Sequence, residues 1–106
     1  DGMWLGERIL PEGWTSYSST RTPSSPYGHY GAHFYTNGLK PVPKSGHRSW
    51  PDLPSDAYYA SGHEGQQIFI IPSREIVIVR LGMTPNKNDW NIGKFAEKIL
   101  PVLPTD

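Results

Sequence analysis

The chain has 106 residues, a length that corresponds to one domain at most and that limits the size of its hydrophobic core. Ten Lys and Arg residues balance ten Asp and Glu residues, so no excess of basic charge favours nucleic acid as a partner. The absence of cysteine excludes disulfides and thiolate metal sites, and no apolar run approaches the roughly 20 residues that a membrane-spanning helix needs.

The N-terminal part of the sequence contains short apolar groups and one predicted helix. Pro11, followed by an acidic residue, is typical of the first position of a helix. Trp14 and Tyr17 are three residues apart and therefore share one helical face. We predict a short helix over residues 11–18, which Gly13 weakens.

The next segment, residues 27–38, is rich in aromatic residues and glycine, a composition that predicts a strand. The dipeptide Asn37-Gly38 ends it with a turn signal. From Leu39 to Asp56 the sequence is polar, holds four prolines and has no periodicity, so we predict a long loop. Loops of this length are uncommon inside a compact domain and are usually functional or mark missing context.

The second half of the chain has the clearest pattern. Gln67–Ile71 and Glu75–Leu81 are β-rich runs separated by a Pro-Ser-Arg turn, and they predict an antiparallel hairpin. Both runs are apolar at nearly every position, so both faces of the predicted sheet should be covered. An amphipathic helix is predicted after them, with Asn91 or Asp89 as its cap and with apolar residues at helical spacing: Ile92, Phe95, Ala96, Ile99 and Leu100.

The predicted fold is α+β, an antiparallel sheet of about three strands with the C-terminal helix packed on one face. That helix can cover one face of the sheet, and the short helix near Pro11 is too small to cover the other alone. The sequence therefore indicates that a covering layer is missing from this chain, and we interpret residues 1–106 as a single partial domain.

The histidines do not form a recognisable metal motif, and we predict neither a metal nor a cofactor. In a strand, His29 and His33 would lie about 13 Å apart, which is too far for one metal ion. His63-Glu64 begins like a zinc-protease motif, but Gln67 stands where the second histidine would be needed. His47 lies in the predicted loop without a neighbouring ligand pattern.

The sequence also lacks a recognisable nucleophile motif or phosphate-binding loop. Neither Gly-x-Ser-x-Gly nor Ser-x-x-Lys occurs. The segment from Thr84 to Lys87 has the second spacing with threonine, and Tyr35-Thr36-Asn37 matches a Tyr-x-Asn triplet. We interpret both as chance, the first in a proline-containing connection and the second as a strand that ends in a turn.

The segment directly before the first hairpin strand is the remaining candidate site. Gly62 and Gly65 flank His63-Glu64, and small residues let a substrate approach a strand backbone closely. Backbone N–H groups there could face a reacting carbonyl. The alternative interpretation is a surface loop whose glycines form a turn.

The same region resembles a known enzyme family. Ser61–Gln66, followed by Ile71–Gly82, resembles the C-terminal part of class C β-lactamase-like serine hydrolases, a group with penicillin-binding-protein, esterase and 6-aminohexanoate-dimer hydrolase relatives. Arg8–Trp14 and Tyr27–Phe34 resemble earlier segments of that family in the same order. The resemblance implies that a Ser-x-x-Lys nucleophile and a Tyr-x-Asn loop lie upstream of the residues present.

The resemblance also implies roles for four residues, because His63-Glu64-Gly65 is similar in position to the Lys-Thr-Gly triplet of the family. His63 would donate hydrogen bonds to the substrate or to a catalytic tyrosine, and the backbone N–H of Gln66 would form half of the oxyanion hole. Gly65 would keep the strand edge clear. Glu64 would point outward or disfavour substrates that carry a carboxylate, such as β-lactams.

The prediction is therefore the C-terminal segment of a bacterial serine hydrolase, inactive alone. It would act on a small amide or ester substrate when joined to the N-terminal part of the same hydrolase, in either the periplasm or the cytoplasm. One alternative is a stand-alone ligand- or protein-binding module, whose surface would be formed by Trp4, Trp14, Trp50, Tyr58 and Tyr59. A second alternative is an excised segment without independent function.

Overall fold

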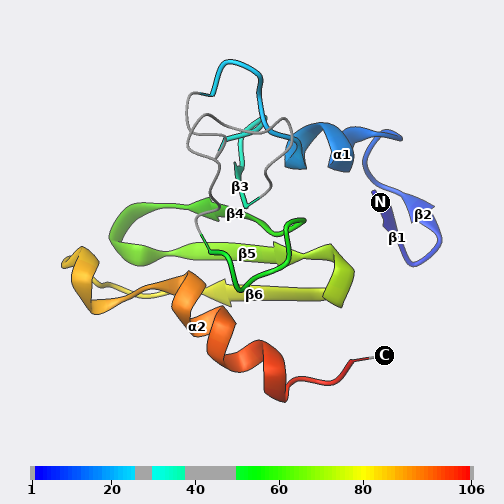
Figure 1. Ribbon diagram of the computed structural model, residues 1–106. Helices are drawn as coiled ribbons and strands as arrows, with labels where there is room; N and C mark the ends of the chain where they lie inside the picture. Colours follow the sequence, from blue (N-terminus) through cyan, green and yellow to red (C-terminus); the bar gives the residue numbers. More distant parts are fainter. Residues whose placement is uncertain (1, 26–29, 38–49, 106) are drawn as a thin grey trace.

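The computed structural model describes residues 2–25, 30–37 and 50–105, and its fold is α+β with antiparallel sheets, as predicted (Figure 1). A four-stranded sheet replaces the predicted sheet of about three strands, and a separate two-stranded sheet lies near the N-terminus. The elements are β1 (Met3–Trp4), β2 (Glu7–Arg8), α1 (Trp14–Ser19), β3 (Tyr35–Thr36), β4 (Tyr58–Ser61), β5 (Gln67–Ile71), β6 (Ile76–Arg80) and α2 (Ile92–Ile99), with 3₁₀ turns at His63–Gly65, Pro72–Arg74, Lys87–Asp89 and Leu100–Val102.

The predicted hairpin is present as β5 and β6 and forms one side of the larger sheet. The strand order is β3-β4-β5-β6, and each neighbouring pair is antiparallel. Phe69 pairs with Tyr59 on one side and with Ile78 on the other, so these three side chains share a face. Ile68 and Val79 pair on the opposite face.

The core lies between the first of these faces and α2, which confirms the prediction that the C-terminal helix packs on one face. Phe69 and Ile71 of β5 are 0% exposed. The helix begins after Asn91, whose side-chain Oδ1 accepts a hydrogen bond from the Lys94 amide at 2.9 Å. The buried core residues are Leu53, Ala57, Phe69, Ile71, Ile92, Ala96 and Leu100.

The opposite face of the sheet is apolar and open in the described part of the chain. Ile68 is 42% exposed, Val77 is 62% exposed and Val79 is 57% exposed. These side chains alternate along the strands with the buried ones, so strand periodicity places all three on the second face. The prediction that both faces of the sheet are covered is met on one face only among the described residues.

The predicted helix over residues 11–18 begins later than expected. Residues Pro11 to Gly13 form a turn in which the Trp14 amide donates to the Pro11 carbonyl at 3.1 Å. Gly13 has φ +81°, a left-handed conformation that a helix interior does not allow. The helix α1 is therefore limited to Trp14–Ser19.

The predicted strand over residues 27–38 is also shorter than expected. Among residues 30–37, which are the described part of this segment, only Tyr35–Thr36 is a strand, with an isolated bridge from Tyr30 to Tyr35. Between them the Gly31 amide donates to the Phe34 carbonyl at 2.7 Å, and His33 has φ +71°, which makes a tight turn. His29 of the predicted strand and residues 39–49 of the predicted loop, which include His47, lie outside the described residues.

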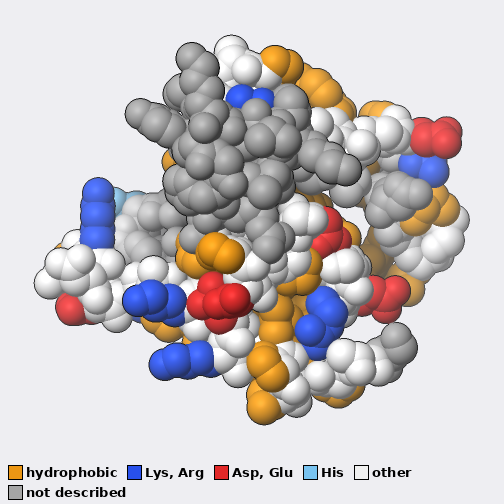
Figure 2. Space-filling model, viewed as in Figure 1, with side chains coloured by type: hydrophobic (Ala, Val, Ile, Leu, Met, Phe, Trp, Pro, Cys, Tyr) orange, Lys and Arg blue, Asp and Glu red, His pale blue; other side chains and the backbone are white. Residues whose placement is uncertain are grey.

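Two structural features were not predicted. Tyr58–Ser61 forms β4, a strand whose aromatic and small residues lie between two turn-rich segments. Met3–Trp4 pairs with the charged residues Glu7–Arg8 as the hairpin β1–β2, which turns through Leu5 and Gly6 at positive φ. Hydrophobic side chains reach the surface in the region of this hairpin and α1 (Figure 2).

Gly93 allows α2 to approach Trp50 more closely than any other residue type would. A Cβ atom at this position would lie 1.8 Å from the indole Nε1 of Trp50, which is shorter than the sum of the two van der Waals radii. Trp50 itself packs against Phe69, with the two ring centroids 5.4 Å apart. The absence of a side chain at Gly93 thus decides how the loop before β4 meets the helix.

We expect Gly93→Ala to destabilise the protein, although alanine is the better helix former by about 1 kcal/mol. The added methyl group would displace Trp50 from the core, and overpacking of this kind costs about 1–3 kcal/mol. Urea unfolding followed by tryptophan fluorescence measures the change. Lys98→Ala, on an exposed position of the same helix, is the control. A more stable Gly93→Ala variant would contradict the packing argument.

Candidate functional site

The predicted site residues form a tight turn between β4 and β5. His63–Gly65 is a single 3₁₀ turn in which Glu64 has φ +56° and ψ +34°, and Gly65 has φ +78°. A left-handed conformation is easy for glycine and strained for glutamate. Contacts outside the turn therefore have to hold Glu64 in place.

This turn lines an open pocket of about 570 Å³, a volume within the range of about 300–1,000 Å³ that is usual for small-molecule sites. The structure brings His63, Glu64 and Gly65 together in its wall, whereas Gln66 is not among the lining residues. The opposite wall comes from the chain that follows β6. The full lining is Ser61, Gly62, His63, Glu64, Gly65, Gln67, Thr84, Pro85, Asn86, Lys87 and Trp90.

The side chains of His63 and Glu64 lie against each other. The His63 side chain is 87% exposed, and its Nε2 lies 3.4 Å from Oε1 of Glu64, whose side chain is 23% exposed. An imidazole in this position is accessible to a group brought in from outside the chain. The carboxylate of Glu64 makes this part of the pocket unfavourable for a second negative charge.

Gln66 is bonded within the turn. Its backbone N–H donates to the His63 carbonyl at 3.2 Å, and its side-chain amide donates to the same oxygen at 3.3 Å. The Gly62 amide in turn donates to the Gln66 carbonyl at 2.8 Å. The oxyanion role predicted for the Gln66 N–H would require the first of these bonds to open.

Trp90 is a pocket residue that the sequence analysis missed. Its indole N–H donates to Oε1 of Gln67 at 2.9 Å, and the Gln67 side-chain amide donates to the Ser61 hydroxyl at 3.1 Å. The guanidinium carbon of Arg80 lies 4.9 Å from the centre of the Trp90 ring. No local pattern signals this role, because Trp90 reaches the pocket only after the chain has turned back from β6.

The two motifs that the sequence analysis attributed to chance have structural partners. Asn37 is 1% exposed; its side-chain amide donates to the Trp50 carbonyl at 2.9 Å, and its Oδ1 accepts from the Trp50 amide at 3.0 Å. The Thr84 amide donates to the Glu64 carbonyl at 2.9 Å, and its hydroxyl accepts from Arg80. Asn37 thus holds a loop, and Thr84 holds the pocket turn.

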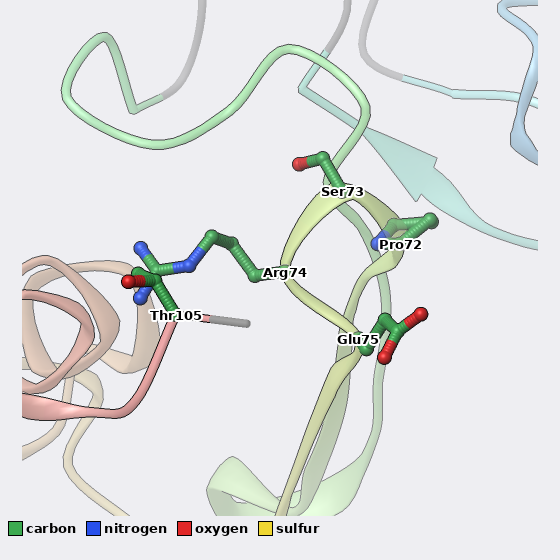
Figure 3. Close-up of a pocket in the computed structure, with 5 residues that line it drawn as sticks. All are labelled: Pro72, Ser73, Arg74, Glu75 and Thr105. Carbon is green, nitrogen blue, oxygen red and sulfur yellow. The ribbon is translucent and has the colours of Figure 1, made fainter.

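A second pocket, of about 190 Å³, lies at the β5–β6 turn and is lined by Pro72, Ser73, Arg74, Glu75 and Thr105 (Figure 3). Both the backbone amide and the hydroxyl of Ser73 donate to the Asp56 carboxylate, at 2.7 and 2.9 Å. Arg74 donates to the Leu100 carbonyl at 2.9 Å. These hydrogen bonds connect the β5–β6 turn to neighbouring segments of the chain. We therefore interpret the polar groups of this pocket as stabilising the fold.

The aromatic surface expected for a binding module is only partly present. Tyr58 is 8% exposed, and Trp50 and Tyr59 are half-buried against the core, so these three residues do not form a surface. The rings of Tyr35, Tyr59 and Phe69 stack in sequence, with centroids 5.1 and 5.3 Å apart. Among the described residues, the exposed large aromatic side chains are Trp4, Trp14, Tyr17, Tyr30 and Phe95.

Within residues 2–25, 30–37 and 50–105, no three His, Cys, Asp or Glu side chains are grouped to hold a metal ion. None of the helices in these ranges has the length and apolar character needed to cross a bilayer.

Comparisons of the chain with protein-family models, with curated proteins and with solved structures found no match. The resemblance to class C β-lactamase-like hydrolases therefore stays a prediction from the sequence. The pocket around His63–Gly65 and the open sheet face are the observations on which a function can be proposed.

Tyr59 gives the structure a testable response to alkaline pH. Burial raises its pKa from the ordinary value of 10.0 to about 12, and the charge of Tyr35 adds to the shift. The folded state therefore holds the Tyr59 proton more tightly than the unfolded state does. The contribution of this group to the free energy of unfolding is complete below about pH 10 and is lost as the pH rises to about 12. We expect Tyr59→Phe to flatten this decline.

The measurement is urea unfolding at a series of pH values from neutral to strongly alkaline, followed by circular dichroism. Tyr17→Phe, which changes an exposed side chain, should keep the alkaline decline of the original chain. An equally steep decline in Tyr59→Phe would show that Tyr59 is not the group responsible.

Proposed function

We propose that this chain is the C-terminal segment of a β-lactamase-like serine hydrolase. It would act on a small amide or ester substrate when joined to the N-terminal part of the same hydrolase. The observation that carries the proposal is the position of the pocket: the His63–Gly65 turn leads directly into β5 and lines a cavity of about 570 Å³. The sequence resemblance implies a substrate-binding role for this same turn.

The chemistry of acyl transfer explains why the chain would be inactive alone. Such a reaction needs a nucleophile as well as fixed donors for the developing oxyanion, and each donor contributes a factor of about 10²–10³ in rate. The sequence contains no Ser-x-x-Lys to supply the nucleophile. His63, which is exposed at the pocket, would donate to the substrate or to a tyrosine of the N-terminal part.

The open face of the sheet supports the same proposal. Ile68, Val77 and Val79 form an apolar surface on β5 and β6, and full burial of such a side chain stabilises by about 1.5–3 kcal/mol. In the described residues no strand pairs with the outer edge of β6. A face and an edge of this kind suit packing against the remainder of a larger domain.

A stand-alone binding module is the second candidate. Trp4 is 67% exposed and Tyr17 is 63% exposed, and the N-terminal hairpin carries an apolar hollow of about 490 Å³ lined by Gly2, Met3, Trp4, Ile9 and Leu10. If this candidate is correct, the chain binds its ligand with full affinity in the absence of any N-terminal part.

We expect the chain alone to show no turnover of nitrocefin or of p-nitrophenyl esters, because it lacks the nucleophile. Addition of an N-terminal part that contains Ser-x-x-Lys should produce ester or amide hydrolysis. His63→Ala should then lower the rate by about 10²-fold or more if it acts in proton transfer or hydrogen bonding at the pocket. Lys98→Ala is the control, and turnover by the chain alone would contradict the proposal.

We also expect Val79→Lys to weaken association with the N-terminal part by at least about tenfold, because a charge would be buried in the apolar contact. Val102→Lys changes a side chain that is 78% exposed outside the sheet and should leave association unchanged. Isothermal titration calorimetry measures both. Equal affinities for the two variants would place the contact elsewhere.

A further inference from the structure

We propose that β6 is an association edge, through which two copies of this chain pair strand to strand about a two-fold axis at Ile78. The two β6 strands run antiparallel, with Val77 of each copy opposite Val79 of the other. This inference concerns the chain alone and does not rest on the proposed function.

The hydrogen bonds of the sheet determine which backbone groups of β6 point toward β5. The Gly62 amide donates to the Gln66 carbonyl at 2.8 Å, so this carbonyl points toward β4. Successive residues of a strand direct their backbone groups to alternate sides, and Phe69, three residues further on, therefore directs its groups toward β6. Its partner Ile78 directs its own backbone groups back toward β5.

The backbone groups of Val77 and Val79 point the other way, off the edge of the sheet, because these residues flank Ile78. Figure 1 shows β6 as the last strand of the sheet. Among the described residues, no strand pairs with this side of β6 and no other backbone hydrogen bond reaches Val77 or Val79. The edge therefore presents a row of unpaired donors and acceptors to which another strand can add.

The strand β6 has none of the features by which proteins usually block a free edge. Its sequence is Ile-Val-Ile-Val-Arg, without lysine or proline, and its pairing with β5 is continuous, without a bulge. The one charged residue of the strand, Arg80, donates to the carbonyls of Glu64 and Gly65, each at 3.2 Å. Ten basic and ten acidic residues leave the chain without a net charge that would keep two copies apart.

A second copy of β6 fits this edge because the strand is complementary to itself. With Ile78 on the two-fold axis, Val77 faces Val79 of the second copy, and both residues direct their backbone groups into the shared ladder. Such a pair exchanges both of its backbone hydrogen bonds, and the axis repeats it. Arg80 of the second copy faces Ile76, next to Glu75, so opposite charges occupy neighbouring positions at each end of the ladder.

The opposite edge of the sheet favours a closed dimer over a longer assembly. The strand β3 consists of Tyr35–Thr36, and Tyr30 forms a bridge to Tyr35. Head-to-tail pairing of β6 with β3 would therefore use a short edge, and it would leave a free β6 on each growing end. Pairing of β6 with β6 uses the long edge of both copies and closes after two.

Sedimentation equilibrium of the chain alone tests the association. We expect a reversible equilibrium between monomer and dimer with a Kd of about 1 mM or tighter, because one strand pair buries less than the roughly 1,200 Å² of a standard interface. A chain that stays monomeric at about 1 mM, or that forms a continuous series of larger oligomers, contradicts the inference.

Two double variants with the same number of introduced charges test the register. Val77→Lys/Val79→Lys places like charges opposite each other in each pair and should weaken the dimer by at least about tenfold. Val77→Glu/Val79→Lys places opposite charges there and should dimerise at least about tenfold more tightly than the first variant. Both variants lose the same exposed apolar side chains, so each is the control for the other. Equal dimerisation of the two would show that the copies meet elsewhere.

Amide hydrogen exchange in the original chain tests the same register without a substitution. The N–H groups of Val77 and Val79 should exchange more slowly as the concentration is raised through the Kd, because they donate to a backbone carbonyl only in the dimer. The N–H of Ile78 donates within the sheet in both states and is the internal control. Exchange at Val77 and Val79 that does not change with concentration overturns the inference.

Discussion

The register between β5 and β6 is the constraint on which the rest of the structure depends. It places Phe69 opposite Ile78 and Ile71 opposite Ile76, so these side chains face α2 and close the core. A slip by one residue would turn every side chain of the strand to the other face. The burial of Phe69 and Ile71 at 0% exposure therefore fixes the hairpin, and the hairpin positions β4 and α2.

The same register builds the pocket. Arg80 pairs with Gln67 at the end of the hairpin nearest the His63–Gly65 turn. From this position Arg80 reaches the carbonyls of the turn, and Gln67 reaches the indole of Trp90. Because both anchors stand on strands of the core sheet, the pocket wall shares the rigidity of the core, which is a requirement for aiming backbone donors at a reacting group.

The structure uses the two faces of one sheet differently. One face carries nearly the whole core and is covered by α2, whereas Ile68, Val77 and Val79 remain exposed on the other. Apolar surface left in water contributes nothing to the free energy of folding, and the proposed association with an N-terminal part rests on this exposed face. The sheet thus links the pocket and the proposed docking surface in one rigid element.

The sequence by itself determined the elements whose signals are local. The apolar runs of β5 and β6 and the helical spacing after Asn91 could be predicted, because periodicity and capping depend on neighbours in the chain. Only the tertiary structure decided that Tyr58 and Tyr59 form a core strand, that Trp90 completes the pocket and that the Gln66 N–H is bonded within its turn. Each of these outcomes depends on contacts between residues that the fold brings together from distant parts of the chain. A local sequence pattern does not predict such contacts.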